Sequence, residues 1–421
     1  MNILLTGASG LIGQAVLTRL LAQGHQVSAV SRHPQTQQPN LRWLQADMAT
    51  LDSAEQWQPL LDGIEVVINC AGIFREHGAQ TFAALHGDAA IALFTACVQC
   101  NVDRVVQLSA LGASLDAPSA YWRSKARADA ALAGLPLDWA VVRPSLVYAD
   151  HGASSQLFCQ LAALPMLLLP HRSAPVQPIH LDDLAALLCT LALKASPRRA
   201  IIDAVGPRAL GFGDYLQALR QGMGMAPARQ GTLTSTLARP LARLAAHLPG
   251  SLVSEDALQM LAAGRPVDPA AAQSLLATPL RDPASFSNPA LRAHHVLAIW
   301  LPILRMSLAS LWLWTAWVSL RYSATGLHLL AESRLPPAWH WPALLSSSAC
   351  DAVLGFLTLL RPSRRLWQLQ LGLTLAYTSY ISLWLPHWWL HPFGPISKNL
   401  PVLALMGLLA AATPANQNPK P

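Results

Sequence analysis

Tyr121 and Lys125 are the side chains whose types and spacing best suit proton transfer in this sequence. Residues four apart on a helix lie on one face, one turn from each other. A lysine ammonium beside a phenol is expected to lower the pKa of the phenol, which then exchanges a proton with an alcohol or carbonyl oxygen near neutral pH. Alternatively, Tyr121 is a half-buried amphipathic aromatic residue and Lys125 a solvated helix charge.

A glycine-rich turn, Thr6–Gly13 (TGASGLIG), is the second candidate for chemistry. A short apolar segment precedes it and an apolar-periodic segment follows it, which predicts a strand, a turn and a helix. Backbone N–H groups and the positive end of the helix dipole at such a turn bind anions, usually the pyrophosphate of a dinucleotide. Gly7 allows the tight turn, Gly10 lets the backbone approach the phosphates, and Gly13 lets the helix pack on its strand. An ordinary surface turn is the alternative.

Two polar residues that follow the next predicted strands are expected to contact the nucleotide. Arg32 stands where an NAD-selecting carboxylate is usual, and a guanidinium can bind a 2′-phosphate and stack on adenine, so NADP(H) is favoured over NAD(H). Asp47 is placed to accept a hydrogen bond from the adenine amino group. In the alternative interpretation, Arg32 is a solvated loop residue and Asp47 is a helix N-cap.

The elements that must position these residues alternate between short β-branched runs and helical stretches. This alternation predicts an α/β fold, a Rossmann-type doubly wound parallel sheet covered on both faces. Ligands of such sheets lie outside the carboxyl ends of the strands, where the residues named above fall. The predicted strands are Asn2–Leu5, Gln26–Val30, Val66–Asn69, Val105–Leu108 and Trp139–Val142.

Together these motifs resemble the extended and atypical branches of the short-chain dehydrogenase/reductase superfamily, over roughly residues 1–225. The run Ser109–Ala113, continued through Ser119–Tyr121, is similar to the subgroup that contains the nucleotide-binding accessory subunit of respiratory complex I and its bacterial relatives. The motifs that carry the resemblance are the glycine turn, Asn69-x-Ala71-Gly72, Ser109, Tyr121-x-x-x-Lys125 and Arg143-Pro144-Ser145-x-Val147-Tyr148.

The resemblance implies roles for individual residues. Ser109 would orient the reacting oxygen, Tyr121 would be the acid/base, and Lys125 would hold the nicotinamide ribose. Two positions depart from the family pattern: Ala149 stands where many relatives have glycine, and His86 where extended members often have asparagine. The residues expected to bind the cofactor are Thr6, Gly7, Ser9, Gly10, Leu11, Ile12, Gly13, Arg32, Asp47, Met48, Cys70, Ala71, Gly72, Tyr121, Lys125 and Pro144.

Composition predicts a membrane part, because 52% of the residues are hydrophobic and only 12% are charged. Residues 1–294 hold 21 basic and 20 acidic residues, whereas residues 295–421 hold 8 and 2. The polar part thus has no basic stripe, and no nucleic-acid partner is expected. The six scattered cysteines and the lack of an expected signal peptide favour a reducing cytoplasm for the front domain. The lone Cys97-x-x-Cys100 pair predicts no metal site.

Four transmembrane helices are predicted, at Met306–Leu320, Trp341–Leu360, Leu366–Leu385 and Leu400–Thr413. The basic loop between the second and third spans is expected on the cytoplasmic side, as is the front domain. The segment 386–401 and the helix count resemble the DoxX-like membrane family. Asp351 is the only acid within a predicted span. It is expected either to have a functional role, in which Arg305 or Tyr377 is its partner, or to make a structural hydrogen bond between helices.

The expected organisation is an NAD(P)-binding domain (1–230), a helical connector (231–295), a DoxX-like transmembrane domain (296–413) and a disordered tail (414–421). Within the connector, the amphipathic segment Leu233–Leu248 either packs on the domain or lies in the membrane interface. The expected protein is a bacterial inner-membrane NADP(H)-dependent short-chain reductase of a lipophilic carbonyl or quinone-like substrate. The alternative is a non-catalytic nucleotide-holding subunit or assembly factor of a membrane respiratory complex.

Overall fold

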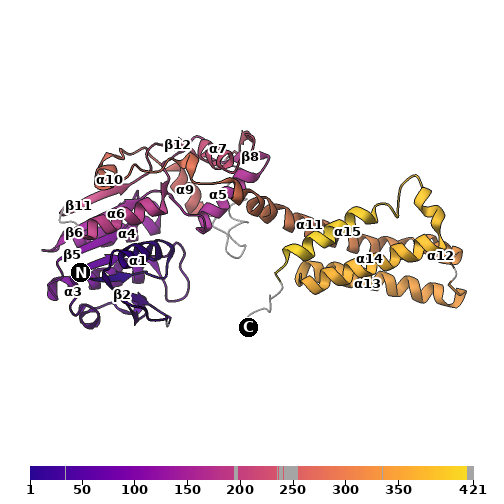
Figure 1. The fold of residues 1–421 in the computed structure, drawn as a ribbon, viewed down its shortest axis with the longest axis horizontal. Coiled ribbons are helices and arrows are strands. Elements are labelled where there is room, and N and C mark those ends of the chain that lie inside the picture. The colour runs from indigo at the N-terminus through magenta and orange to yellow at the C-terminus, as the bar shows by residue number, and fades with distance from the viewer. Residues whose placement is uncertain are drawn as a thin grey trace. The chain divides into compact units, whose positions relative to one another are not determined.

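The computed structural model describes residues 1–33, 35–193, 198–234, 255–333 and 335–414, with 236 and 240 in addition. It divides into two compact units, Met1–His295 and Val296–Pro421 (Figure 1). Most of the predicted amphipathic segment 233–248, and the predicted tail beyond residue 414, lie outside the described residues.

In the N-terminal unit, the described residues form a seven-stranded sheet in the order β11-β6-β5-β4-β1-β2-β3. Every neighbouring pair in this sheet is parallel. The order reverses between β1 and β4, and a ligand crevice is expected outside the carboxyl ends of the strands at such a point. The predicted Rossmann-type fold is confirmed, and the edge strands β3 and β11 extend it beyond the five predicted strands. The strands are β1 (Asn2–Thr6), β2 (Gln26–Ser31), β3 (Leu41–Gln45), β4 (Val66–Asn69), β5 (Arg104–Leu108), β6 (Asp138–Pro144) and β11 (Ala200–Ala204).

Helices cover both faces of this sheet because successive strand residues point to opposite sides. Ile3 and Leu5 of β1 pack in one core with α1 and α6, whereas Leu4 packs in the other core with α2, α3 and α4. The helices are α1 (Leu11–Ala22), α2 (Ala54–Trp57), α3 (Ala89–Gln99), α4 (Ala120–Ala133) and α6 (Leu181–Leu193).

A third core lies on the segments that follow the sheet strands, chiefly α5 and α7. Residues expected to form a connector pack into this unit, because Phe286 is buried in the third core and Ala272 and Leu280 are buried in the first. The remaining elements of this unit are β7 (Val147–Tyr148), α5 (Ala153–Ala163), β8 (Met166–Leu169), β9 (Pro175–Val176), β10 (Ile179–His180), β12 (Leu210–Gly211), α7 (Phe212–Gly222), β13 (Arg229–Thr232), α9 (Glu255–Ala262) and α10 (Ala270–Leu275).

The C-terminal unit is helical, with a small apolar core around Trp312, Trp367 and Met406. Among the described residues, two helical stretches are long and apolar enough to cross a membrane, Pro289–Arg321 and Pro337–Leu360. The other two predicted spans coincide with α14, which is 21 residues long, and α15, which is 14 residues long. The helices are α11 (Pro289–Arg321), which begins in the N-terminal unit, α12 (Ser323–Glu332), α13 (His340–Leu360), α14 (Arg364–Trp384) and α15 (Asn399–Ala412).

Candidate functional site

The turn between β1 and α1 has a shape that only glycine permits at two positions. Gly7 has a positive φ of 67°, and a Cβ there would lie 2.6 Å from the Cys70 carbonyl group. A Cβ on Gly13 would lie 2.1 Å from the Gly7 carbonyl oxygen. Gly10 is the N-cap of α1 and has no capping side chain, so the N–H groups of the first helical turn have no partner within the helix. This arrangement fits the pyrophosphate of a dinucleotide.

A buried chain of polar side chains joins the carboxyl ends of three neighbouring strands. The Thr6 hydroxyl donates to Asn69 Oδ1, and Asn69 Nδ2 donates to Gln107 Oε1 at 2.7 Å. The Ala71 N–H also donates to Asn69 Oδ1, at 3.2 Å. These bonds hold the segment after β4 against the glycine turn. Gln107 had no motif to reveal it in the sequence.

Lys125 lies below this segment, on the face of α4 that packs on the sheet. Its Nζ donates to the carbonyl oxygens of Leu108 at 3.1 Å and Ala71 at 3.3 Å. The side chain is only 3% exposed, so the alternative of a solvated charge is wrong. Burial lowers the pKa of Lys125 to about 8. A Cβ on Gly72 would approach Nζ to 3.1 Å, so the backbone here lies directly against the ammonium group.

Tyr121 lies one turn before Lys125, within an aromatic cluster. Its ring stacks on Phe74 with centroids 5.1 Å apart and meets His86 and Phe82 edge-on at 5.6 and 5.8 Å. Burial raises the pKa of the phenol. The prediction that Lys125 lowers this pKa is therefore wrong, because the ammonium is directed at two carbonyl oxygens and the phenol is desolvated by its aromatic neighbours.

His86 links the Tyr121 helix to the loop after β4. The Ile73 N–H donates to His86 Nε2 at 2.9 Å, and His86 Nδ1 lies 2.9 Å from Ser124 Oγ, which donates to the Tyr121 carbonyl oxygen. Because Nε2 accepts, the neutral ring carries its proton on Nδ1. Burial, with Lys125 nearby, lowers the His86 pKa to about 2. His86 therefore positions the loop after β4 against α4, at a position where this sequence departs from the family pattern.

Ser109 contacts a buried ion pair. Its hydroxyl donates to Asp129 Oδ2 at 2.7 Å, and the same oxygen accepts from Arg143 Nη2 at 3.1 Å and Nε at 3.2 Å. Burial raises the pKa of Asp129, opposed by Ser109 and Arg143. The orienting role implied for Ser109 stays a prediction. Sequence reasoning missed Asp129, although it follows Tyr121 and Lys125 at the same spacing of four.

The two residues predicted to select and hold the adenosine differ in their surroundings. Arg32 is exposed and makes no ion pair with any residue that the structure describes. Asp47 Oδ1 accepts hydrogen bonds from the Ala49 N–H at 3.1 Å and from Gln80 Nε2 at 3.0 Å. Asp47 is thus the N-cap of a short helix, Met48–Thr50, which agrees with the N-cap alternative given for it from the sequence.

The other residues predicted to bind the cofactor lie at different depths around the turn. Burial raises the pKa of the Cys70 thiol to about 12, so this thiol is neutral near pH 7. The buried members are Thr6, Gly13, Met48 and Ala71, the half-buried ones are Ile12, Cys70 and Pro144, and the exposed ones are Ser9, Gly10, Leu11 and Gly72.

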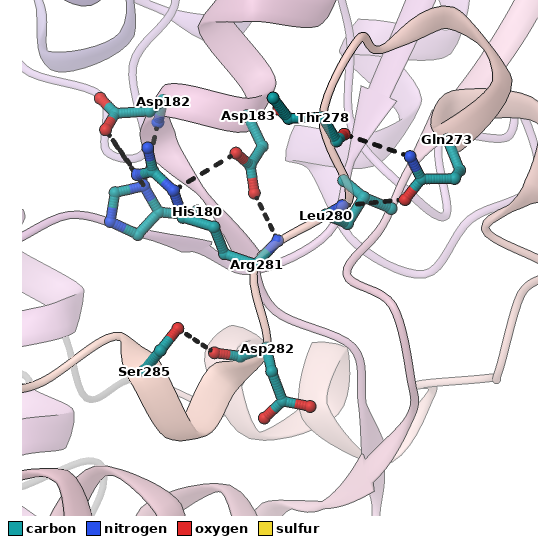
Figure 2. Close-up of polar contacts among 9 residues, drawn as sticks. All are labelled: His180, Asp182, Asp183, Gln273, Thr278, Leu280, Arg281, Asp282 and Ser285. Carbon is teal, nitrogen blue, oxygen red and sulfur yellow. Dashed lines mark hydrogen bonds and ion pairs between the residues drawn. The ribbon is translucent and has the colours of Figure 1, made fainter.

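A second polar cluster ties a late segment to the N-terminus of α6 (Figure 2). Arg281 Nη1 lies 2.5 Å from Asp182 Oδ2 and 2.6 Å from His180 Nδ1. The backbone N–H of Arg281 donates to Asp183 Oδ2 at 2.9 Å. Burial and Arg281 lower the pKa of His180, which keeps the ring neutral. The partners in this cluster satisfy one another, so it secures the loop and has a structural role.

Comparison with known proteins identifies two domains. Residues 7–159 match the NAD(P)H-binding family, and residues 309–407 match the DoxX-like family. An uncharacterized protein of Mycobacterium tuberculosis is 28% identical over 225 residues, which are 53% of this chain and 24% of that protein. A mitochondrial NADH dehydrogenase [ubiquinone] 1 alpha subcomplex subunit 9 from Dictyostelium discoideum is 24% identical over 158 residues, 37% of this chain and 44% of that protein. The chain thus spans less than half the length of these curated relatives.

Solved structures share the fold of the N-terminal unit. An NADPH-dependent quinone oxidoreductase from Escherichia coli, complexed with NADPH, has a TM-score of 0.55 at 17% identity, covering 67% of this chain and 97% of its own. A human epimerase family protein with NADPH has a TM-score of 0.51 at 20% identity, covering 70% and 99%. MoeE5 in complex with UDP-glucuronic acid and NAD has a TM-score of 0.51 at 20% identity, also covering 70% and 99%. The chain therefore combines an NAD(P)H-binding domain with a DoxX-like domain, and its structural neighbours hold NADPH or NAD.

Proposed function

We propose that this chain is a membrane-anchored NADP(H)-dependent reductase of the short-chain type, acting on a lipophilic carbonyl or quinone-like compound. The observation that carries the proposal is the position of Tyr121. Its helix is fixed by Lys125 to the Ala71 segment, which lies against the glycine turn, while its ring lies in a partly open aromatic cluster. A proton donor and a nucleotide cradle therefore belong to one connected arrangement.

Each residue of the site has a separate role in the proposed reduction. The hydride would come from NADPH when it is bound at the glycine turn. The Tyr121 phenol donates the proton to the substrate oxygen, and its raised pKa means that it is protonated near neutral pH before the reaction. Lys125 holds the strand ends and presents a positive charge below Gly72. Ser109 and Pro144 complete the predicted surroundings of the reacting groups.

The surroundings of Tyr121 favour a planar, apolar substrate. Phe74 is 76% exposed and already stacks on the Tyr121 ring, so a flat molecule that displaces it gains the same stacking. Phe82 supplies a second aromatic edge. Lipid-soluble substrates of this kind reach an enzyme that is held at the bilayer by its DoxX-like domain.

Arg32 and the apolar helices support the remaining parts of the proposal. The exposed Arg32 guanidinium is available for a 2′-phosphate. A four-span anchor in the inner membrane, with the N-terminal domain in the cytoplasm, is consistent with the basic residues in the turn after α13 and at the start of α14, which are Arg361, Arg364 and Arg365.

The test is the Tyr121→Phe variant of the full chain in detergent, assayed for NADPH oxidation with a panel of quinones and lipophilic aldehydes. We expect turnover at saturating NADPH to fall at least about 100-fold, because proton donation is lost. Tyr322→Phe, at an exposed tyrosine, is the matched control and should keep full activity. If no compound raises the rate above the blank, or if Tyr121→Phe is as active as the control variant, the enzyme proposal fails.

A nucleotide-holding subunit or assembly factor of a respiratory complex is the second candidate. The hydroxyl proton of Ser109 is held by Asp129, and the Dictyostelium relative is named as a subunit of NADH dehydrogenase. This function predicts tight NADPH retention, no turnover and co-purification with a multi-subunit membrane complex. A free, homogeneous protein that turns over NADPH would select the reductase instead.

A further inference from the structure

One layer of polar side chains inside the C-terminal unit is fully paired. Gln370 Oε1 accepts from Trp312 Nε1 at 3.1 Å, and Gln370 Nε2 donates to Thr358 Oγ1 at 2.7 Å. The Thr358 hydroxyl in turn donates to the Leu354 carbonyl oxygen at 2.7 Å. This layer joins α11, α13 and α14, and each polar atom has a partner within the bundle.

A second pair of polar side chains, Ser348 and Asp351 on α13, lacks such partners. Ser348 is 1% exposed and Asp351 is 6% exposed. Neither Ser348 Oγ nor Asp351 Oδ1 has a hydrogen-bond partner among the described residues. Residues three apart share a helix face, so both groups point along the same buried stripe as Thr358. Leaving such groups buried without partners is costly, which indicates a bound group that the fold itself does not supply.

The paired layer fixes the depth of this second site. Helices α13 and α14 run antiparallel across a three-residue turn, and Thr358 bonds Gln370. Two turns onward along each helix, Asp351 and Tyr377 lie at one level, about 10 Å from the paired layer at 1.5 Å per residue. Tyr377 is 38% exposed at this level, and it makes no hydrogen bond to Asp351 Oδ1.

Arg305 lies on the other side of the paired layer from Asp351. Helix α11 is antiparallel to α13, since Leu313 lies beside Gly355 and the chain then continues into α12, where Gly326 lies beside Leu344. Arg305, two turns before the Trp312 level, is thus about 20 Å from the Asp351 level. Arg305 is therefore too far away to pair with Asp351, and the expected partnership with it is wrong.

We propose that Ser348 and Asp351 bind the hydroxyl head group of a lipophilic alcohol or phenol that enters from the bilayer between α13 and α14. The Asp351 oxygen needs a donor, and the Ser348 hydroxyl can accept from or donate to the same group. The outer face of α13 is apolar, with Val353 and Phe356 more than half exposed. Helix α14 packs on α15 over more of its length than on α13, so the seam between α13 and α14 is the entry path that we propose. The site is independent of the chemistry proposed at Tyr121.

Equilibrium binding of radiolabelled 4-dodecylphenol to the full chain in maltoside micelles tests the proposal, with dodecylbenzene as the probe without a hydroxyl. We expect Asp351→Leu to weaken dodecylphenol binding about tenfold and Ser348→Ala about threefold, from the loss of one hydrogen bond each. Ser346→Ala, at an exposed serine of the same helix, is the matched control and should bind like the unmodified chain. Dodecylbenzene should bind all four proteins equally weakly.

A measurement on the unmodified chain keeps the test valid if a variant misfolds. Dicyclohexylcarbodiimide modifies protonated carboxyl groups in apolar surroundings, and mass spectrometry locates the product. Dodecylphenol should slow the modification of Asp351 at least about fivefold, and dodecylbenzene should not. Glu332, which lies 3.1 Å from His328, should stay unmodified under every condition and thus checks the selectivity of the reagent. Equal binding of the two probes, or equal protection of Asp351 by both, would overturn the proposal and leave Asp351 as an interhelical contact only.

Discussion

Helix α4 in the N-terminal unit and helix α13 in the C-terminal unit each bury ionisable or polar groups along one face, and they differ in how these groups are paired. On α4, Lys125 donates to two carbonyl oxygens and Asp129 accepts from Ser109 and Arg143. On α13, Asp351 Oδ1 and Ser348 Oγ have no partner in the described part of the chain. Asp129 Oδ1 also lacks a partner, but its carboxyl group is held through Oδ2, whereas no hydrogen bond joins the Asp351 side chain to a described residue. The Asp129 carboxyl group is therefore bonded within the fold, and the Asp351 carboxyl group is not.

The largest expected effect is on the paired helix. Asp129→Leu removes the partner of the half-buried Arg143 and of the buried Ser109 hydroxyl, so the free energy of unfolding should fall by about 3 kcal/mol. Urea titration of the full chain, followed by the reactivity of the fully buried Cys97 thiol, measures the N-terminal unit. Asp129→Leu combined with Arg143→Leu should recover part of the loss. If Asp129→Leu lowers the free energy of unfolding by less than about 1 kcal/mol, the Asp129–Arg143 ion pair does not stabilise the packing of α4.

The next effect concerns pH and His86, which joins α4 to the loop after β4. Its pKa is about 2 in the folded chain, against about 6.5 when unfolded, so the unfolded state binds more protons between these values. The stability that it contributes is complete above pH 6.5 and is lost as the pH falls, at about 1.4 kcal/mol per pH unit. His86→Asn keeps an acceptor for Ile73 and should flatten this fall.

Unfolding of both proteins at pH 7, 6 and 5 checks the His86 prediction. His180 also has a lowered pKa, titrates in the same direction and is present in both, so the difference in slope isolates His86. Equal slopes in the two proteins would mean that the ring is not held neutral.

A smaller effect is expected at Arg32, a cation that the fold leaves exposed. Arg32→Ala should weaken NADPH binding about tenfold and leave NADH binding within about twofold, since only the 2′-phosphate loses its partner. Direct titration of both nucleotides measures the preference. Arg42→Ala, an exposed arginine of β3, is the control. A variant that keeps its preference for NADPH would exclude Arg32 as the selecting residue.

The smallest effect is expected on the unpaired helix. In Asp351→Leu no described residue loses a hydrogen bond to Asp351 Oδ1, and an apolar side chain replaces a buried carboxyl group. The free energy of unfolding should therefore change by less than about 0.5 kcal/mol or rise. Thermal unfolding in detergent, without added amphiphile, provides the measurement. A loss comparable to that of Asp129→Leu would show that Asp351 is paired and would remove the contrast between the helices.

Local patterns were enough to predict the sheet and the nucleotide turn. The β-branched runs and the glycine spacing act within a few residues, so the five predicted strands and the strand-turn-helix order agree with the structure. The same applies to Tyr121 and Lys125, which share one face of α4. The DoxX-like region was also predicted, because long apolar runs need no tertiary information.

The environment of the site depends on contacts between distant residues. The raised pKa of Tyr121 comes from burial among aromatic rings such as Phe74, about 50 positions earlier in the chain. Ser109 is held by Asp129, 20 positions later, and Arg281 reaches His180 across 101 positions. No spacing rule reports such pairs, because tertiary packing decides them.

The turn at Gly7, Gly10 and Gly13 has a kinetic consequence. Its shape is held by a backbone hydrogen bond from the Gly10 N–H to the Gly7 carbonyl oxygen at 2.9 Å and by close backbone contacts. At this turn no flexible side chain has to be ordered when the pyrophosphate arrives, so this part of the association should need no slow rearrangement. Capture of the pyrophosphate would then be limited by encounter with the nucleotide and not by ordering of the turn.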